Sequence, residues 1–279
     1  MNPVTHGLTA HAYKALVSLI YEHSRIQIGA DRQSMLQNRL RRRIGELELE
    51  SFDDYVALLS SRRDPDELDM VVDLVSTNHT HFYREPDHFA FLSQRVIPEL
   101  LPALTSANRP MNVWSAAASS GEECYTIAMV LSDELAKYPG LSWRIIASDI
   151  SRSILARAQR GVYRLDDVDR VPVEQLKRYF ERGHGRFEGT CRVRAELRQK
   201  VQFERINLFQ PAYPDMVAQD VIFCRNVMIY FDLPSRILLI KRLSEMLRPG
   251  GYLVIGCSEN LVGIPHGLQA IQQGIYQKS

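Results

Sequence analysis

The stretch WSAAASSGEECY, Trp114–Tyr125, decides the fold that we predict for this chain. The β-forming residues Val113 and Trp114 precede seven small residues, and the pair Glu122–Glu123 then starts an apolar pattern with helical spacing. This order indicates a strand, a tight turn and the N-terminus of a helix, where a ligand can approach the backbone closely. The stretch therefore predicts the first strand–helix unit of an α/β domain.

Two glutamates at such a turn favour a ligand that is cationic or rich in hydroxyl and amino donors, because a phosphate-binding loop would carry a lysine or bare amides. S-adenosylmethionine, with its sulfonium, ammonium and ribose groups, matches this description. A purely structural alternative stays open. Ser119 with Glu122, and Ser120 with Glu123, have the spacing of a helix capping box that needs no ligand.

From Pro110 onward, strand and helix patterns alternate, which is typical of a parallel sheet with crossover helices. We predict strands at 111–117, 143–150, 201–206, 220–224 and 252–257, helices at 121–137, 151–160 and 234–247, and a last strand pair near 270–277. Glycines and an alternating pattern in residues 183–199 indicate an inserted antiparallel hairpin, either decorative or used to recognise a partner. Residues 111–279 therefore predict a Rossmann-like, doubly wound α/β domain with a small inserted β-subdomain.

Residues 1–75 have apolar positions at helical spacing and no strand alternation, which predicts a small all-α domain. Its helix near residues 32–47 is either a solvated charged face or a docking face for an acidic partner. The charges on that helix are Arg39, Arg41, Arg42 and Arg43.

Residues 76–110 form a linker that is unusually polar near its start, in the stretch STNHTHFYRE. Its histidines, His79 and His81 with His88 nearby, lack a carboxylate or cysteine at convincing ligand spacing, so we expect no metal site.

The formal net charge of +1 over 279 residues argues against nucleic acid as a partner. The four cysteines are scattered without a CxxC pair, which favours a reducing compartment over disulfides or zinc. No signal-peptide pattern stands at residues 1–20, and no apolar run reaches the length of about 18 residues that spans a bilayer. We expect a cytoplasmic protein without direct membrane insertion.

Polar residues at the carboxyl ends of parallel strands are the candidate ligand contacts. Asp149 suits ribose hydroxyls or a helix cap, and Asn207 suits an adenine edge or a turn. A buried Arg225 would need a carboxylate from Glu123, from Asp149 or from a ligand. The remaining candidates after the fourth predicted strand are Cys224, Asn226 and Tyr230.

The chain has no P-loop, kinase or nucleophile–histidine signature. Methyl transfer from a sulfonium to a carboxylate fits this absence, because the nucleophile is already ionised and requires alignment rather than a general base.

Six stretches in order resemble the chemotaxis receptor glutamate O-methyltransferases (CheR type), from about Thr9 to Tyr276. They are STNHTHFYRE, WSAAASSGEECYTIA, ASDI, INLF, IFCRNVMIYF and RPGGYLVIGCSEN. The resemblance implies S-adenosylmethionine as cofactor and S-adenosylhomocysteine as product. It also implies a monomer that methylates glutamates on the cytoplasmic domains of chemotaxis receptors during sensory adaptation.

Residue by residue, the resemblance places Arg84 near both the cofactor and the substrate carboxylate, and Tyr230 near the transferred methyl group. The other implied cofactor contacts are Asn78, Thr80, Glu123, Asp149, Asn207, Leu208, Arg225 and Asn226. Arg39 and Arg41–Arg43 match the family's receptor-docking helix, and the inserted hairpin matches a subdomain that in some members binds a receptor C-terminal peptide. Cys124 stands where the family commonly has proline, in the first turn of a helix. A nucleic-acid methyltransferase and a binding module without activity are the alternatives.

Overall fold

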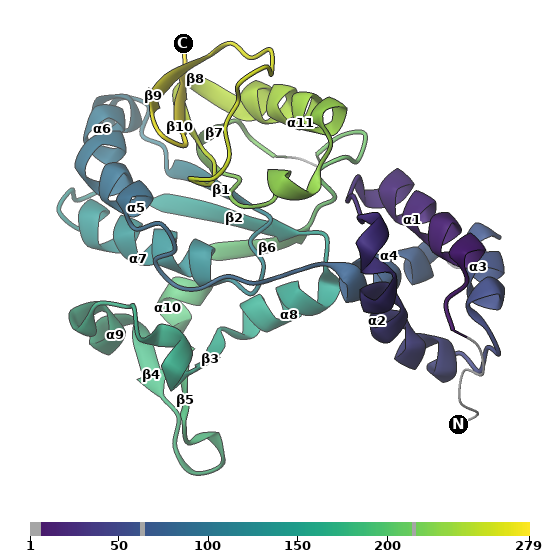
Figure 1. The fold of residues 1–279 in the computed structure, drawn as a ribbon. Coiled ribbons are helices and arrows are strands. Elements are labelled where there is room, and N and C mark those ends of the chain that lie inside the picture. Colours follow the sequence, from purple (N-terminus) through teal and green to yellow (C-terminus); the bar gives the residue numbers. More distant parts are fainter. Residues whose placement is uncertain (1–6, 62–64, 214–215) are drawn as a thin grey trace.

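The computed structural model describes residues 7–61, 65–213 and 216–279. Figure 1 shows a helical domain at the N-terminus, a larger α/β domain and a small sheet that projects from it. A linker runs from α4 (Pro65–Val75) across the α/β domain to α5 (Asp87–Phe91). Within the described ranges, every helix is too short or too polar to span a bilayer.

The helical domain consists of α1 (Ala10–Ser24), a 3₁₀ turn (Ala30–Arg32), α2 (Gln33–Glu46), α3 (Phe52–Ser60) and α4. Thr9 and Ser51 are the N-cap residues of α1 and α3, and each side chain accepts a hydrogen bond from a first-turn amide. The apolar faces of the four helices meet in a core that contains Leu16, Leu36 and Tyr55. The helical character predicted for this part of the chain is confirmed, except at residues 1–6 and 62–64, which lie outside the described residues.

The α/β domain contains a seven-stranded sheet with the order β6-β2-β1-β7-β8-β10-β9. The first five strands are parallel, and β10 pairs antiparallel with β8 and β9. The strands are β1 (Met111–Ala116), β2 (Trp143–Asp149), β6 (Val201–Arg205), β7 (Gln219–Phe223), β8 (Leu247–Val254), β9 (Leu268–Gln272) and β10 (Ile275–Lys278). The predicted doubly wound fold class is confirmed.

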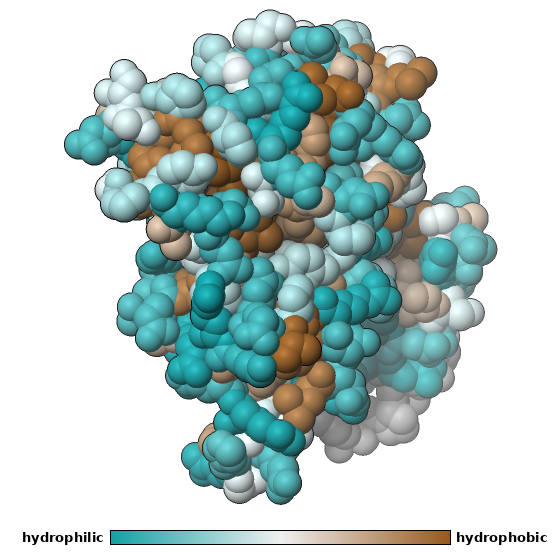
Figure 2. Space-filling model, turned by 90° about the vertical axis from the view of Figure 1, so that its left-hand side faces the viewer, coloured by the Kyte–Doolittle hydropathy of each residue, from teal (hydrophilic) through white to brown (hydrophobic). Residues whose placement is uncertain are grey.

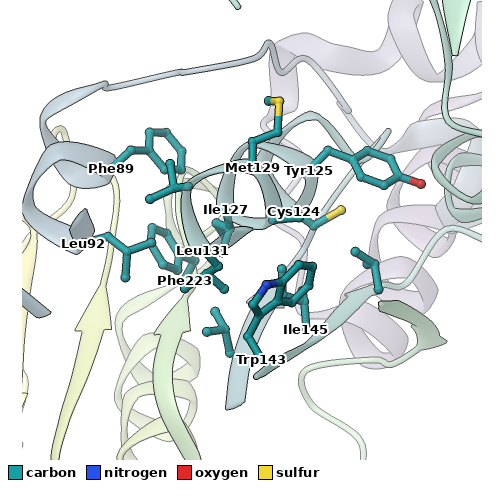
Figure 3. Close-up of a cluster of buried hydrophobic side chains, with 14 of the residues drawn as sticks. Phe89, Leu92, Cys124, Tyr125, Ile127, Met129, Leu131, Trp143, Ile145 and Phe223 are labelled. Atoms are coloured by element: carbon teal, nitrogen blue, oxygen red, sulfur yellow. The ribbon is translucent and has the colours of Figure 1, made fainter. Parts of the chain in front are cut away.

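The parallel strands are apolar on both faces, because helices cover each face of the sheet (Figure 1). In β7, Val221 and Phe223 face one core, whereas Ile222 faces the other. Figure 3 shows the core that contains Phe223, where α7 (Glu122–Leu135) packs against Trp143, Ile145 and Phe223. The covering helices are α5, a π-helical turn (Leu92–Val96), α6 (Ile97–Ser106), α7 (Glu122–Leu135), α8 (Arg152–Arg160) and α11 (Leu233–Met246).

The inserted β-subdomain is larger than predicted and begins earlier in the chain. It is a three-stranded antiparallel sheet with the order β3-β5-β4. Its elements are β3 (Val162–Arg164), a 3₁₀ turn (Leu165–Val168), α9 (Val173–Tyr179), β4 (Phe180–Arg182), a 3₁₀ turn (Gly185–Phe187), β5 (Thr190–Val193) and α10 (Ala195–Arg198). The hairpin predicted over 183–199 is therefore the β4–β5 pair, and residues 195–198 are helical rather than extended. Figure 2 shows the projection as mainly hydrophilic, at the bottom of the view.

The linker is attached to this subdomain by three consecutive side chains. His81 lies 3.3 Å from the Arg170 guanidinium, and the Phe82 ring packs edge-on against Tyr163 and Phe180. The Tyr83 hydroxyl donates a hydrogen bond to the Gln175 side chain. The polar linker is therefore a packed element with defined side-chain contacts.

Candidate functional site

A cavity of about 560 Å³ lies at the carboxyl edge of the parallel strands. This volume falls in the range of small-molecule sites, about 300–1,000 Å³. Its walls come from the turn after β1, the ends of β2, β6 and β7, the linker, and residues 24–35 between α1 and α2 of the helical domain. Both domains therefore enclose the same space.

The turn after β1 is tightly wound. Ala117, Ser119 and Gly121 have φ angles of 65°, 50° and 97°, in the left-handed region. A Cβ atom at Gly121 would lie 2.9 Å from Ala158 Cβ and 2.9 Å from the Tyr163 hydroxyl, so this position requires glycine. Gly121 is also the residue that precedes the first turn of α7.

Neither capping box forms at this turn. Ser119 Oγ donates to the backbone carbonyl of Asn78 at 2.9 Å, and Ser120 Oγ donates to the Glu122 carboxylate at 2.6 Å. Glu122 is buried away from the cavity, whereas Glu123 lines it. The alternative that both glutamates only cap the helix is therefore wrong, and their roles differ.

Glu123 is held in place by a serine and an arginine. Its carboxylate accepts a hydrogen bond from Ser115 Oγ at 2.7 Å and one from Arg225 Nη1 at 3.1 Å. Burial raises the pKa of the Glu123 carboxyl, and the Arg225 charge opposes this rise. The predicted carboxylate partner of Arg225 is thus Glu123, and a second partner comes from the linker.

That second partner is Glu85, which sequence reasoning did not identify. Its carboxylate accepts hydrogen bonds from Arg225 Nη2 at 2.9 Å, Asn226 Nδ2 at 3.1 Å and the Cys257 amide at 3.1 Å. Burial would raise the pKa of Glu85, but the hydrogen bonds from Asn226 and Arg225 outweigh it and lower the pKa to about 2. Glu85 is therefore ionised at neutral pH.

Asp149 lines the cavity at the end of β2 and is almost fully buried. It accepts hydrogen bonds from the amides of Ser119 at 2.9 Å and Ser151 at 3.0 Å. Burial raises the pKa of this carboxyl, and the amides oppose the rise. The helix cap of α8 is Ser151, not Asp149. Asp149 keeps acceptor capacity toward the cavity, because each carboxylate oxygen has two lone pairs.

Asn207 joins the two domains. Its side-chain amide donates to the His23 carbonyl at 2.7 Å, and its side-chain oxygen accepts from the Phe209 amide at 2.9 Å. A second contact between the domains links the Gln27 amide to the Tyr230 carbonyl at 2.9 Å. Asn207 lines the cavity and also makes the predicted turn.

Arg84 carries a charge that no carboxylate neutralises within the described ranges. Its guanidinium donates to the His79 carbonyl at 3.1 Å, and the half-buried side chain lines the cavity. Tyr230 lines the same cavity from the turn after β7. A cavity lined by Arg84 and by the carboxylates Glu123 and Asp149 can bind an anionic group and a cationic one together.

The structure thus brings together ten of the predicted site residues around one cavity: Asn78, Thr80, Arg84, Glu123, Asp149, Asn207, Leu208, Arg225, Asn226 and Tyr230. Cys224 is not brought there, because its side chain is fully buried in the core on the α11 side of the sheet. Side chains alternate along a strand, so Cys224 points into the sheet's packed face.

Sequence reasoning also missed Glu259, which accepts hydrogen bonds from three amides, those of Asn226, Met228 and Gly256. It fixes the turn after β7. The only sequence signal was its place within the stretch RPGGYLVIGCSEN.

Glu85, His88 and Cys257 form a cluster with metal-ligand side chains behind the cavity. Two facts argue against an ion there. The Arg225 guanidinium lies 2.9 Å from Glu85, and the two His88 nitrogens face different partners, Glu85 at 3.5 Å and Cys257 at 3.6 Å. Burial and the Arg225 charge lower the pKa of His88 to about 4.

The arginines of α2 have unequal roles. Arg43 forms a paired hydrogen bond with the buried carboxylate of Glu67, at 2.5 and 3.0 Å. Arg39 donates to the Val75 carbonyl at 2.6 Å, at the start of the linker. Arg41 is exposed, and the Arg42 side chain is 89% exposed, although it pairs with Glu46 on the same helix at 2.9 Å. The surface available to a partner is therefore Arg41 with Arg42.

Comparisons with known proteins agree with this architecture. The CheR methyltransferase SAM-binding domain matches residues 78–276, and the CheR methyltransferase all-alpha domain matches residues 11–76. The chain is 37% identical over 267 residues to a chemotaxis protein methyltransferase of Salmonella typhimurium, covering 96% of this chain and 90% of that protein. A protein of the same name from Escherichia coli is 38% identical, with 96% and 90% covered. One from Borreliella burgdorferi is 32% identical, with 98% and 96% covered.

Proposed function

Because this chain belongs to the CheR methyltransferase family and contains its S-adenosylmethionine-binding domain, we propose that it methylates glutamate side chains of chemotaxis receptors. The product on the receptor is a glutamate methyl ester. The observation that supports this proposal is the cavity lined by Arg84, which pairs with no carboxylate among the described residues, together with half-buried Glu123 and buried Asp149.

The donor set fits the cofactor. Glu123 is suited to its ammonium group and Asp149 to its ribose hydroxyls, because both are carboxylate acceptors that line the cavity. Leu208 and Ile150 supply apolar surface for a base. S-adenosylmethionine, when bound, supplies an electrophilic methyl group on a sulfonium. The other residues proposed to hold it are Asn78, Thr80, Asn207, Arg225 and Asn226.

The protein's part in the reaction is alignment. A receptor glutamate is ionised at neutral pH, so no side chain has to remove a proton before attack. Arg84 would hold one carboxylate oxygen while the other faces the methyl group, and Tyr230 would pack beside the reacting atoms. The cavity lies between both domains, and displacement of water by the bound substrate would strengthen the attraction between Arg84 and the substrate carboxylate.

We infer that the receptor docks on α2 through Arg41 and Arg42. Their exposure supports this inference, whereas Arg39 and Arg43 are engaged within the protein. Replacing both Arg41 and Arg42 by alanine is expected to raise KM for the receptor with little change in kcat or in affinity for S-adenosylhomocysteine. An unchanged KM would exclude this face.

We also infer that the inserted sheet binds a receptor C-terminal peptide and that the enzyme acts as a monomer. Exposed positions on β4 and β5, among them Arg182 and Arg192, support an acidic peptide as the ligand. Titration with a short acidic peptide and with its charge-neutral analogue tests the first inference. Sedimentation of the full chain tests the second.

The decisive experiment combines the unaltered chain, methyl-labelled S-adenosylmethionine and purified receptor cytoplasmic domains. We expect label on glutamate that alkali releases, as an ester requires. Calorimetry with S-adenosylhomocysteine gives the cofactor test separately. Binding weaker than about 1 mM, or alkali-stable label, would contradict the proposal.

A further inference from the structure

Glu85 does not line the cavity, yet it contacts two segments beyond the linker, and one of them, Arg225 with Asn226, builds the cavity wall. Its carboxylate accepts from Arg225 and Asn226 after β7, and from the amide of Cys257 after β8. Glu85 itself belongs to the linker, next to Arg84. One half-buried carboxylate therefore connects the linker to the ends of two neighbouring strands.

Arg225 connects Glu85 to Glu123 at the cavity. Its side chain is 1% exposed and lies between two carboxylates, with Nη2 2.9 Å from Glu85 and Nη1 3.1 Å from Glu123. Nη2 also donates to the backbone carbonyl of Arg84. The guanidinium fork is planar and rigid, so fixing one branch on Glu85 fixes the branch that holds Glu123.

The backbone beside Arg84 is strained on both sides. Tyr83 and Glu85 have φ angles of 54° and 56°, a conformation that side chains with a Cβ rarely adopt. Both neighbours are anchored, Tyr83 on Gln175 and Glu85 on Arg225, while Arg84 lines the cavity between them. Such strain persists only where surrounding contacts hold it.

We propose that Glu85 is a positioning residue for methyl transfer, which fixes Arg84 and Arg225 at the cavity wall. The proposal rests on the proposed function, since it assigns Arg84 the substrate carboxylate. Glu85 acts through these two arginines and touches neither the cofactor nor the substrate.

The test compares Glu85→Gln with Asp220→Asn in the full chain. Asp220 is a matched control, because it is a buried carboxylate that pairs with Arg109 at the other end of β7. We expect Glu85→Gln to lower kcat about tenfold or more while S-adenosylhomocysteine affinity stays within about threefold. Asp220→Asn is expected to lower the melting temperature and to leave kcat within about twofold.

A second variant keeps the charge and guards against misfolding. Glu85→Asp shortens the side chain by one methylene, so it cannot reach Arg225, Asn226 and the Cys257 amide together. We expect kcat to fall here as well. A kcat within about twofold of the unaltered enzyme for Glu85→Asp, or for folded Glu85→Gln, would overturn the proposal.

A double substitution separates positioning from general support of the fold. If Glu85 acts through Arg84 and Arg225, then Glu85→Gln lowers kcat by a smaller factor in the Arg84→Ala background than in the unaltered chain, because only the route through Arg225 remains. Equal fractional losses in both backgrounds would overturn the positioning role. Absence of receptor methylation by the unaltered chain would instead refute the proposed function, so the two failures are distinguishable.

Discussion

The two ends of β7 carry opposite arrangements of the same chemistry. At its amino end, one buried carboxylate, Asp220, faces two arginines, Arg109 at 2.7 Å and Arg248 at 3.7 Å. Beyond its carboxyl end, one buried arginine, Arg225, faces the two carboxylates Glu85 and Glu123.

This difference separates a structural ion pair from a binding site. The amino end has an excess of positive charge, and Asp220 also accepts from the Asn112 amide, so it is fully engaged in the fold. The carboxyl end has two carboxylates for one arginine, and one of these carboxylates, Glu123, lines the cavity. A cationic cofactor complements the second arrangement and not the first.

The largest expected effect comes from removing the arginine at each end. Arg225→Ala leaves two half-buried carboxylates, 18% and 12% exposed, without their arginine and should lower the free energy of unfolding by about 3 kcal/mol. Arg109→Ala should lower it less, because Arg248 remains near Asp220. Only Arg225→Ala should abolish binding of S-adenosylhomocysteine. Urea unfolding and calorimetry measure both quantities, and equal loss of binding in the two variants would break the comparison.

Arg84→Ala tests whether the free cation beside the cavity acts on the reaction rather than on the fold. We expect kcat to fall about 10²–10³-fold, as for other groups that align or stabilise reacting charge, with an unchanged melting temperature. Arg95→Ala is the control. Arg95 is 59% exposed, pairs with Glu99 four residues later, and does not line the cavity. Retained turnover in Arg84→Ala would remove Arg84 from its proposed role.

His88 makes the carboxyl end sensitive to acid. Its pKa is lowered to about 4 from 6.5, so the folded state binds its proton less readily than the unfolded state does. The stability that neutral His88 provides is complete above pH 6.5 and is lost as the pH falls toward 4, by up to about 3 kcal/mol. His88→Gln should flatten the unfolding free energy across this window in urea titrations. An equal dependence of the unfolding free energy on pH in His88→Gln and in the unaltered chain would contradict this expectation.

The smallest effect compares the turn at the cavity with a distant turn. Gly121 and Gly140 have similar φ angles of 97° and 90°, but only a Cβ at Gly121 would meet other atoms. Alanine at either position destabilises the fold because the backbone has a positive φ. At Gly121, overpacking lowers the free energy of unfolding by about 1–3 kcal/mol more. Thermal unfolding of both variants measures the difference. Equal destabilisation would mean that α8 and Tyr163 shift without cost.

Local patterns predicted the parts of the molecule that depend on neighbours in sequence. The strand, turn and helix at Trp114–Tyr125 are confirmed, and so are the parallel strands, since each carries its signal within a few residues. The inserted sheet was only partly predicted, because β3 and β4 have three residues each, too few for an alternation to register.

The missed site residues depend on contacts between distant parts of the chain. Glu85 meets Arg225 and Asn226 across 140 and 141 positions, and no local pattern encodes that meeting. We predicted Cys224 at the cavity because it ends a predicted strand. The face to which its side chain points depends on the alternation along that strand, and the structure puts it in the core beneath α11.

The cavity walls have a thermodynamic consequence. A ligand that fills a space enclosed by two domains contacts both, so part of its binding free energy holds the domains together. Linkage is reciprocal. Loss of an interdomain contact, such as the hydrogen bond of Asn207 with His23, should weaken binding of the ligand. The bound ligand should in turn oppose separation of the domains. A ligand bound in this cavity would therefore help to hold the two domains together.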